Sequence, residues 1–362
     1  MAEWLIQDTT LIEIANAVRE KTGKNEGITV TEIAAEIAGM EIGGKDYLAD
    51  RLDGTLTEYS NNNIKYIGDY ALARCSNLTS VNCPACEAVE YYAFSMCENL
   101  THLGLSACKI IGEGAFDNCT SLTTIDFPSC EIIGIYAFYN CNSLTTAKFL
   151  ACTNIYKNAF ERCSNLSDIN FPACTDIASS AFESCTSLTT IDFPMCETIG
   201  NYAFSGCNSL VSASFPVCTH IGSYAFNCCT NLTTINFSAC ESIEINAFFA
   251  CPNLTSIDLP NCATVGIKAF ENCDNLTTVN IPACEVIRVG AFESCSKLTS
   301  VYINGDTVCR LENKNAFNET PMSSSEYTGS YGSIYVPASL VDAYKTAENW
   351  SYYADRITAI VE

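Results

Sequence analysis

Residues 115–136 read AFDNCTSLTTIDFPSCEIIGIY, and most of the chain is built from variants of this stretch. Its phenylalanine recurs most regularly, because ten Phe residues follow one another at intervals of 22. They are Phe94, Phe116, Phe138, Phe160, Phe182, Phe204, Phe226, Phe248, Phe270 and Phe292. A fixed period of this length is typical of a solenoid, in which each repeat forms one coil that contacts only its neighbours.

The apolar positions inside one repeat predict a short strand. Leu122, Ile125 and Phe127 follow the spacing L-x-x-L-x-L that is typical of leucine-rich repeats. Alternation of apolar and polar residues places Ile125 and Phe127 inward, with Thr124 and Asp126 facing solvent. One coil cannot offset its own loss of conformational entropy, so we expect the array to fold only as a stack.

The full repeat pattern is Leu-x-x-Ile-x-Phe-Pro followed by Ile-Gly-x-x-Ala-Phe-x-x-Cys, beginning at Leu122. It resembles the BspA-like class of bacterial leucine-rich repeat, over residues from about 50 to 310. The resemblance implies a right-handed, mostly β leucine-rich-repeat solenoid with a parallel sheet along one face. The cysteine after the strand and the slightly shorter repeat depart from the commonest form of the family.

The 24 cysteines follow the same period. Eleven lie three residues after the phenylalanine position and ten form a second register, which predicts ladders of buried thiols acting as small apolar residues. Disulfides between neighbouring rungs are one alternative, although parallel side chains suit the required torsion poorly. A zinc half-site at Cys83-x-x-Cys86 is another, although the chain has no second CxxC. Only Cys83, Cys228 and Cys309 fall outside both registers.

Composition excludes several classes of function. The net charge of −23 argues against nucleic acid or an anionic membrane as the partner. No apolar run approaches the roughly 18 residues that span a bilayer, so we expect no membrane insertion. The chain contains two histidines and no P-loop, nucleophile elbow, HExxH or EF-hand motif. We therefore expect no enzymatic activity, no cofactor and no metal site.

Three segments are expected along the chain. Residues 1–45 lie outside the period and predict a small helical cap or docking segment, while residues 46–310 form the solenoid of about twelve coils. Residues 311–362 form a C-terminal cap, with a last strand at Ile334–Pro337 and a short helix over residues 340–347 that precedes residues 357–361. The stretch from Ser323 to Gly332 predicts a loop.

The N-terminal segment carries a second resemblance. Residues 1–45 resemble the leader of prophage-encoded tail-associated proteins from Gram-positive gut bacteria. Residues 1–8 lack the basic region and long apolar stretch of a secretory signal. We therefore expect synthesis in the cytoplasm with a virion or extracellular destination.

A longer period of three coils overlies the short one. Residues 119–128 and 185–194 both read CTSLTTIDFP, and Ala147 and Ala213 occupy the same strand position one coil further on. This spacing of 66 residues indicates that a block of three coils was copied. Residues repeated by copying are weak evidence of function.

The outward strand positions form two polar columns that are the candidate binding surface, described as concave by analogy with other solenoids. Side chains that depart from the column pattern are the first candidates, and the repeated aspartates are the second. Asp126, Asp192 and Asp258 stand three coils apart, about 14 Å at strand spacing, so they cannot share one metal ion. A stripe of tyrosines before the Ala-Phe pair is a further candidate. The full set of strand-face candidates is His102, Asp126, Lys148, Asp168, Asp192, Asp258 and Tyr302.

These observations favour a non-catalytic recognition or adhesion protein that binds a protein or glycan through the solenoid surface. The N-terminal resemblance favours a virion- or tail-associated version. A cell-surface adhesin that binds host matrix or other bacteria is the alternative, and a purely structural repeat protein is the third possibility.

Overall fold

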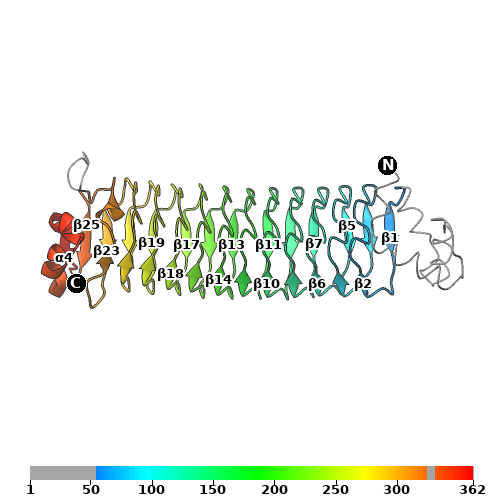
Figure 1. The fold of residues 1–362 in the computed structure, drawn as a ribbon, viewed down its shortest axis with the longest axis horizontal. Helices are drawn as coiled ribbons and strands as arrows, with labels where there is room; N and C mark the ends of the chain where they lie inside the picture. The colour runs from blue at the N-terminus through cyan, green and yellow to red at the C-terminus, as the bar shows by residue number, and fades with distance from the viewer. Residues whose placement is uncertain (1–53, 324–330, 362) are drawn as a thin grey trace, which may run out of the picture.

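The computed structural model describes residues 54–323 and 331–361. The predicted N-terminal segment 1–45, with its prophage resemblance, and most of the predicted loop lie outside the described residues. The described chain forms one long rod of stacked coils, with the C-terminal cap at the far end (Figure 1). Each coil carries two short strands, one of three residues and one of two.

Each three-residue strand has at its centre the residue equivalent to Ile125, which the repeat pattern predicts to point inward. We call the surface made by their outward side chains the strand face. These strands are β1 (Glu58–Ser60), β3 (Ser80–Asn82), β5 (His102–Gly104), β7 (Thr124–Asp126), β9 (Thr146–Lys148), β11 (Asp168–Asn170), β13 (Thr190–Asp192), β15 (Ser212–Ser214), β17 (Thr234–Asn236), β19 (Ser256–Asp258), β21 (Thr278–Asn280) and β23 (Ser300–Tyr302).

A second face carries a sheet that the sequence analysis did not anticipate. Twelve two-residue strands, at the Ile-Gly position of the repeat, pair in parallel without interruption from one end of the rod to the other. They are β2 (Tyr66–Ile67), β4 (Ala88–Val89), β6 (Ile110–Ile111), β8 (Ile132–Ile133), β10 (Asn154–Ile155), β12 (Asp176–Ile177), β14 (Thr198–Ile199), β16 (His220–Ile221), β18 (Ser242–Ile243), β20 (Thr264–Val265), β22 (Val286–Ile287) and β24 (Arg310–Leu311).

The strand face, in contrast, is divided into separate sheets. Pairing is absent between β5 and β7, between β11 and β13, and between β17 and β19, although all six strands belong to the described part of the chain. We call these places seam 1, seam 2 and seam 3. Within a sheet, Phe149 N–H donates to Asn170 C=O at 2.9 Å and Ser167 N–H donates to Thr145 C=O at 3.0 Å. The equivalent bonds do not form across a seam between the described strands.

The inward residue at the centre of each strand explains where the seams fall. Each seam separates two coils that both carry Leu or Ile there: Leu103 and Ile125, Ile169 and Ile191, Ile235 and Ile257. Among the hydrogen-bonded pairs from β1 to β23, at least one side carries a different residue, most often Ala or Val. The exception lies in the cap, where Ile334 of β25 stays paired with Ile357 of β26. Two large side chains at successive rungs overfill the space beneath the strands, so the strands move apart.

The core is a set of side-chain ladders along the axis of the rod. The periodic phenylalanines are fully buried and stack on one another, with ring centroids 5.1 to 5.5 Å apart between Phe94 and Phe292. The buried leucine and alanine of each repeat pack beside them. The period therefore arises because each coil must present the same shape to the coil before and the coil after it.

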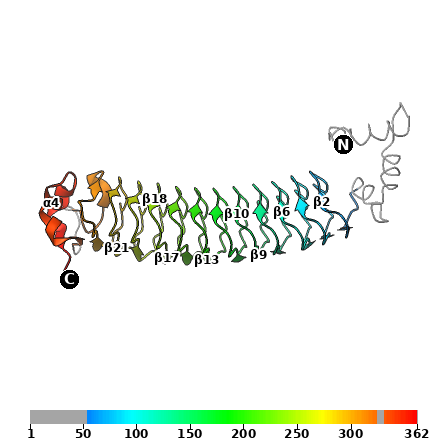
Figure 2. The same ribbon diagram turned by 90° about the horizontal axis from the view of Figure 1, so that it is seen from below.

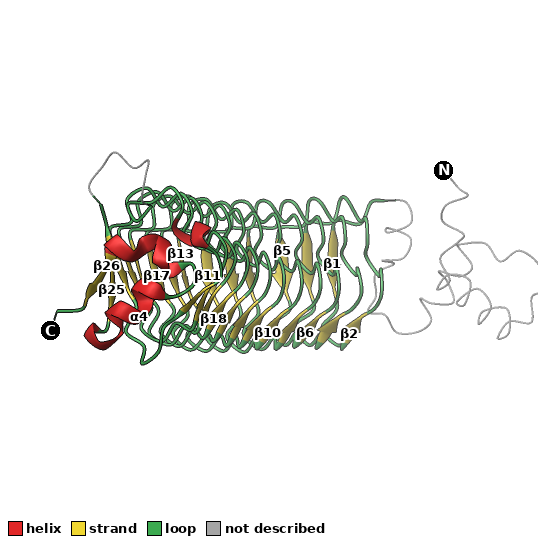
Figure 3. Cartoon of the chain, turned by 60° about the vertical axis from the view of Figure 1, so that its left-hand side comes forward, coloured by secondary structure: helices red, strands yellow, loops and turns green. Residues whose placement is uncertain are grey.

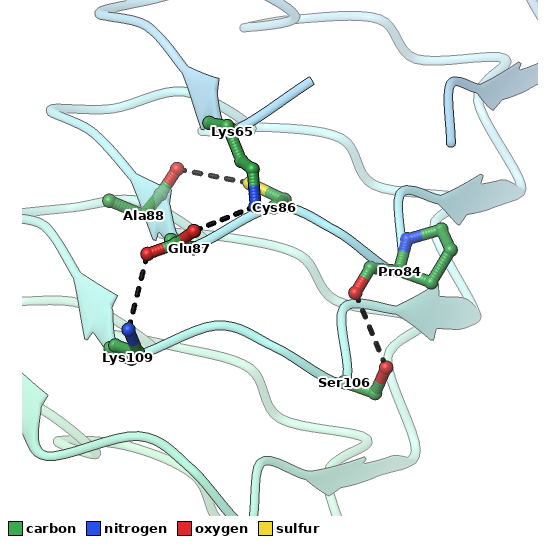
Figure 4. Close-up of polar contacts among 7 residues, drawn as sticks. All are labelled: Lys65, Pro84, Cys86, Glu87, Ala88, Ser106 and Lys109. Atoms are coloured by element: carbon green, nitrogen blue, oxygen red, sulfur yellow. Dashed lines mark hydrogen bonds and ion pairs between the residues drawn. The ribbon is translucent and has the colours of Figure 1, made fainter. Parts of the chain in front are cut away.

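The cysteines are free and, except for the half-buried Cys228, all buried. In the first register the thiol donates a hydrogen bond to a carbonyl of the preceding coil, as in Cys163 Sγ to Phe138 O at 3.1 Å. In the second register it donates to the carbonyl two residues further on, as in Cys86 Sγ to Ala88 O at 3.1 Å (Figure 4). The predicted ladder is confirmed, and each thiol is also a weak donor that Ala or Val could not replace. Burial raises the pKa of Cys108 and Cys152 to about 12.

Thiol labelling of the folded protein tests this arrangement. We expect a water-soluble thiol reagent to modify Cys228 rapidly and the other 23 of the 24 cysteines only after unfolding, because Cys228 is partly exposed and the others are buried. Counting labels by mass spectrometry checks this result. The variant Cys228→Ser should remove the fast reaction. A count well below 24 in denaturant without reductant would show disulfides and contradict the free-thiol ladder.

The C-terminal cap closes the last coil. Of the three residues inserted before Phe317, two lie between β23 and β24, because Val286 pairs with Arg310, 24 residues further on, and the third lies between β24 and Phe317. The 3-10 helix η1 (Lys314–Phe317) follows, and Phe317 still stacks on Phe292 at 5.3 Å. The strand β25 (Ser333–Val336) forms where predicted, and it is followed by β26 (Ile357–Ala359), so it is not the last strand. Helix α4 (Val341–Thr346) confirms the predicted helix, and 3-10 helices η2 (Ala338–Leu340) and η3 (Trp350–Arg356) flank it (Figure 3).

Three aromatic side chains of the cap cover the open end of the core. Tyr344, Trp350 and Tyr353 are buried, and the indole N–H of Trp350 donates to Cys309 C=O at 2.6 Å. The N–H of Cys309 donates to the Tyr344 hydroxyl at 2.9 Å. Strand β24 crosses the boundary expected between residues 310 and 311, so the solenoid passes into its cap without a linker.

Candidate functional site

The outward positions of the strand face point to solvent as predicted. In β7, Thr124 and Asp126 are exposed while Ile125 between them is 2% exposed. Figures 1 and 2 show an almost straight rod, so the strand face is a long flat ribbon along the axis. The expectation of a concave face is therefore wrong, because coils of similar width on both faces stack without strong curvature.

Three of the candidate residues lie together on one sheet. Asp126, Lys148 and Asp168 come from the adjacent strands β7, β9 and β11, and Asp126 pairs in register with Lys148. The Lys148 ammonium lies 3.9 Å from a carboxylate oxygen of Asp168. Both side chains are about half exposed, so the ion pair stabilises the fold little. Its residues remain accessible to a partner.

The other candidates are spread along the face. The imidazole Nδ1 of His102 lies 2.8 Å from its neighbour's hydroxyl, Thr101 Oγ1. Asp258 accepts a hydrogen bond of 2.7 Å from the Asn280 amide, one coil away. Tyr302 stacks on Tyr335 of the cap, with ring centroids 4.6 Å apart and planes within 9°. The structure therefore places His102 and Tyr302 near opposite ends, and they do not form one site.

The repeated aspartates have a position that the sequence analysis did not recognise. Asp126, Asp192 and Asp258 each belong to the strand on the C-terminal side of a seam. The signal was present in the sequence, because each of these coils carries a central Ile preceded by a coil with Leu or Ile. The three aspartates are thus repeated features of three equivalent places.

The repeat pattern agrees with a known family. The sequence matches the family described as "BspA type Leucine rich repeat region (6 copies)" over residues 56–167, 87–211, 153–262 and 219–338. The chain belongs to this family. A search of curated proteins finds no match.

One solved structure shares the fold of this BspA-type chain, and two others are similar to it at lower TM-scores. A leucine-rich repeat protein from Bacteroides ovatus ATCC 8483 has a TM-score of 0.63 and 21% identity, covering 86% of this chain and 85% of that chain. A leucine rich cell surface protein from Faecalibacterium prausnitzii A2-165 has a TM-score of 0.39 and 22% identity, covering 70% and 80%. A leucine-rich repeat protein from Eubacterium ventriosum ATCC 27560 has a TM-score of 0.42 and 20% identity, covering 81% and 90%.

The outer face of the twelve-stranded sheet carries its own charged contacts in this BspA-type array. Glu87 bridges two lysines of neighbouring coils, with Lys65 Nζ 2.8 Å from one carboxylate oxygen and Lys109 Nζ 3.1 Å from the other (Figure 4). The hydrogen bond from Lys65, followed by that from Lys109, holds the pKa of Glu87 below its ordinary value. Tyr66 on the same sheet is 65% exposed. This face was not predicted, because the two-residue strands of the second sheet show no alternation in the sequence.

The predicted tyrosine stripe is interrupted but clustered. Tyr70, Tyr91 and Tyr92 form a cluster with ring centroids 4.5 to 5.7 Å apart. Tyr202 and Tyr224 stack at 4.8 Å further along the rod. Tyr70, Tyr92, Tyr202 and Tyr224 have φ between 50° and 60°, the left-handed region that the turn before each Ala-Phe pair requires. These tyrosines therefore lie in a turn of each coil, and their side chains are partly exposed.

The matched family is described as a leucine-rich repeat region. In the described residues no group of three or more His, Cys, Asp or Glu side chains is arranged to hold a metal ion. Among the helices of residues 54–323 and 331–361, none is long and apolar enough to cross a lipid bilayer. The chain is accordingly a BspA-type leucine-rich repeat protein.

Proposed function

We propose that this protein is a recognition or adhesion protein that binds a protein or glycan through its strand face. The observation that carries the proposal is the strand face itself, which repeats the same small polar positions on twelve successive three-residue strands. These side chains have no packing role, since they point away from the core. An extended surface of this kind suits a partner that is itself long or repetitive.

Two versions of the proposal differ in where the protein acts. In the first, it is associated with a virion or phage tail, which the resemblance of residues 1–45 supports. In the second, it is a cell-surface adhesin that binds host matrix or other bacteria. Immunogold labelling of induced culture supernatants and of intact cells separates the two versions. Label on particles supports the first, and label on cell envelopes supports the second.

Substitution on the strand face tests the proposed binding surface. We expect the combined variant Lys148→Ala, Asp168→Ala and Tyr302→Ala to lose about tenfold or more in affinity for a partner found on a glycan and protein array. Tyrosine is a frequent binding hot spot, and the variant also removes both charges of the exposed Lys148–Asp168 pair. Titration by biolayer interferometry checks the loss. Since these side chains are outside the core, folding should be unchanged.

A matched control lies on the twelve-stranded sheet. The variant Tyr66→Ala, Lys109→Ala and Asp176→Ala removes the same three residue types from the other face. It should bind as the unsubstituted protein does. Full binding by the strand-face variant together with loss in the control would move the site to the second sheet. Absence of any partner on the array would favour a purely structural repeat protein.

A further inference from the structure

The three seams leave backbone polar groups of the strand face without a protein partner across the gap. At seam 2, the N–H of Phe171 faces β13, but the bond to Asp192 C=O that its position in the repeat would make is not formed. The Thr189 N–H and the Ser167 C=O likewise do not pair across this gap between described strands. Each seam therefore has donors and acceptors on both of its walls. Such groups require water or a ligand.

An apolar side chain lies at the base of each seam. Leu103, Ile169 and Ile235 are half-buried, whereas the equivalent Ile125 and Ile191 are 2% and 3% exposed. The gap also widens the core beneath it. The rings of Phe171 and Phe193, on the two sides of seam 2, lie 5.9 Å apart, whereas the flanking pairs are 5.2 and 5.3 Å apart.

The seams repeat at a fixed distance with the same chemistry. Successive seams are three coils apart, about 14 Å at strand spacing. An aspartate stands on the C-terminal side of each, and the other side carries a small or amide residue. The aspartates are Asp126, Asp192 and Asp258, and the residues opposite them are Gly104, Asn170 and Asn236.

We propose that the three seams are equivalent subsites for a linear neutral glycan that lies along the strand face. A hydroxyl group donates and accepts at once, which matches walls that present both N–H and C=O groups. The sugar's C–H groups would contact the half-buried Leu or Ile, and the aspartate would accept a further hydroxyl hydrogen bond. The chain's charge of −23 disfavours an anionic polymer, and the N–H groups of the walls disfavour a cation.

The repetition makes a prediction about length. A glycan long enough to reach two or three seams would convert the second contact into an intramolecular one, so its affinity would rise steeply with chain length. A short oligosaccharide of the same sugar would occupy one seam and bind weakly. This inference rests on the proposed function, because it names the ligand class of the strand face.

Closing the seams tests the proposal. The variant Leu103→Val, Ile169→Val and Ile235→Val should restore pairing, because Ile and Val at successive rungs are hydrogen-bonded between β19 and β21. Hydrogen–deuterium exchange of the full chain should then slow in the strands that flank the seams. Binding of long neutral oligosaccharides from the array should fall by tenfold or more. The matched control Ile133→Val, Ile199→Val and Ile243→Val makes the same kind of change inside the twelve-stranded sheet and should keep binding.

A measurement on the unsubstituted protein keeps the test independent of the variants. Saturating long glycan should slow exchange of the seam amides, whereas the same sugar in short form should not. Glycan binding without protection of these amides, or unchanged binding when exchange shows the seams closed, would overturn the seam subsites. Loss of binding in the Lys148, Asp168 and Tyr302 variant would in that case still support the strand face. If no neutral glycan binds, the seams hold water only and the proposal is wrong.

Discussion

Replacing Phe182 by alanine is expected to lower the free energy of unfolding by about 3–5 kcal/mol, the usual cost of removing a buried phenyl ring. Phe182 is fully buried and stacks on Phe160 at 5.2 Å and on Phe204 at 5.3 Å. Because each coil is stabilised by its two neighbours, the cavity weakens both interfaces of the central coil. Urea unfolding followed by circular dichroism measures the change.

Phe249 provides the matched control. It follows Phe248 directly but points outward and is half-buried, so Phe249→Ala removes the same ring without breaking the ladder. We expect a loss below about 1 kcal/mol for this variant, typical of a surface substitution. Equal losses for the two variants would contradict the view that the Phe ladder, rather than aromatic content in general, holds the coils together.

Raising the pH above about 9 is expected to destabilise the protein steeply, because many thiols must stay protonated in the folded state. Burial raises the pKa of Cys108, Cys152, Cys207 and Cys251 to about 12, whereas a thiol in the unfolded chain ionises near pH 8.5. Unfolding therefore releases protons between these two values, and stability falls as the pH rises through this window. Each thiol contributes about 1.4 kcal/mol per pH unit.

Urea titrations at about pH 8 and about pH 10 measure this dependence. The variant with Cys108, Cys152, Cys207 and Cys251 all changed to alanine should have a slope smaller by about 5 kcal/mol per pH unit. A stability that stays constant to about pH 11 would contradict the buried-thiol ladder.

The coil and its core could be predicted because packing determines them. The period of Phe116 and Cys119 follows from stacking identical shapes, and the structure confirms both ladders. The second sheet was missed because its strands, such as Ile132–Ile133, are two residues long and show no alternation. A pattern of that length cannot be distinguished from a turn.

Predicting the seams would require Ile and Val to be distinguished at the central strand position, where the repeat pattern treats both as equivalent apolar residues. Ile169 next to Ile191 breaks the pairing, whereas Ile257 next to Val279 keeps it, although both pairs are β-branched and apolar. The difference is one methylene in one side chain of the pair, and its effect depends on the volume available beneath the strands. Within the stacked coils, pairs of large inward residues at successive rungs mark the seams, whereas Ile334 and Ile357 of the cap stay paired.

The sequence predicted which side chains of the candidate site point outward, but not which of them contact one another. Alternation placed Asp126 and Lys148 outward, and the structure confirms it. The contact between Lys148 and Asp168 was not foreseen, because exposed side chains are not constrained by packing. The identity of the partner stays a prediction for the same reason.

The two faces of the rod give it a preferred direction of bending. The twelve-stranded sheet is hydrogen-bonded without interruption from Tyr66 to Leu311, so it resists being stretched along the axis. The strand face is joined only within its sheets, and its seams can open further without loss of a backbone hydrogen bond. A sideways load therefore bows the rod with the strand face on the outer curve. The rod should therefore bend more easily with the strand face on the outer curve than with the twelve-stranded sheet on the outer curve.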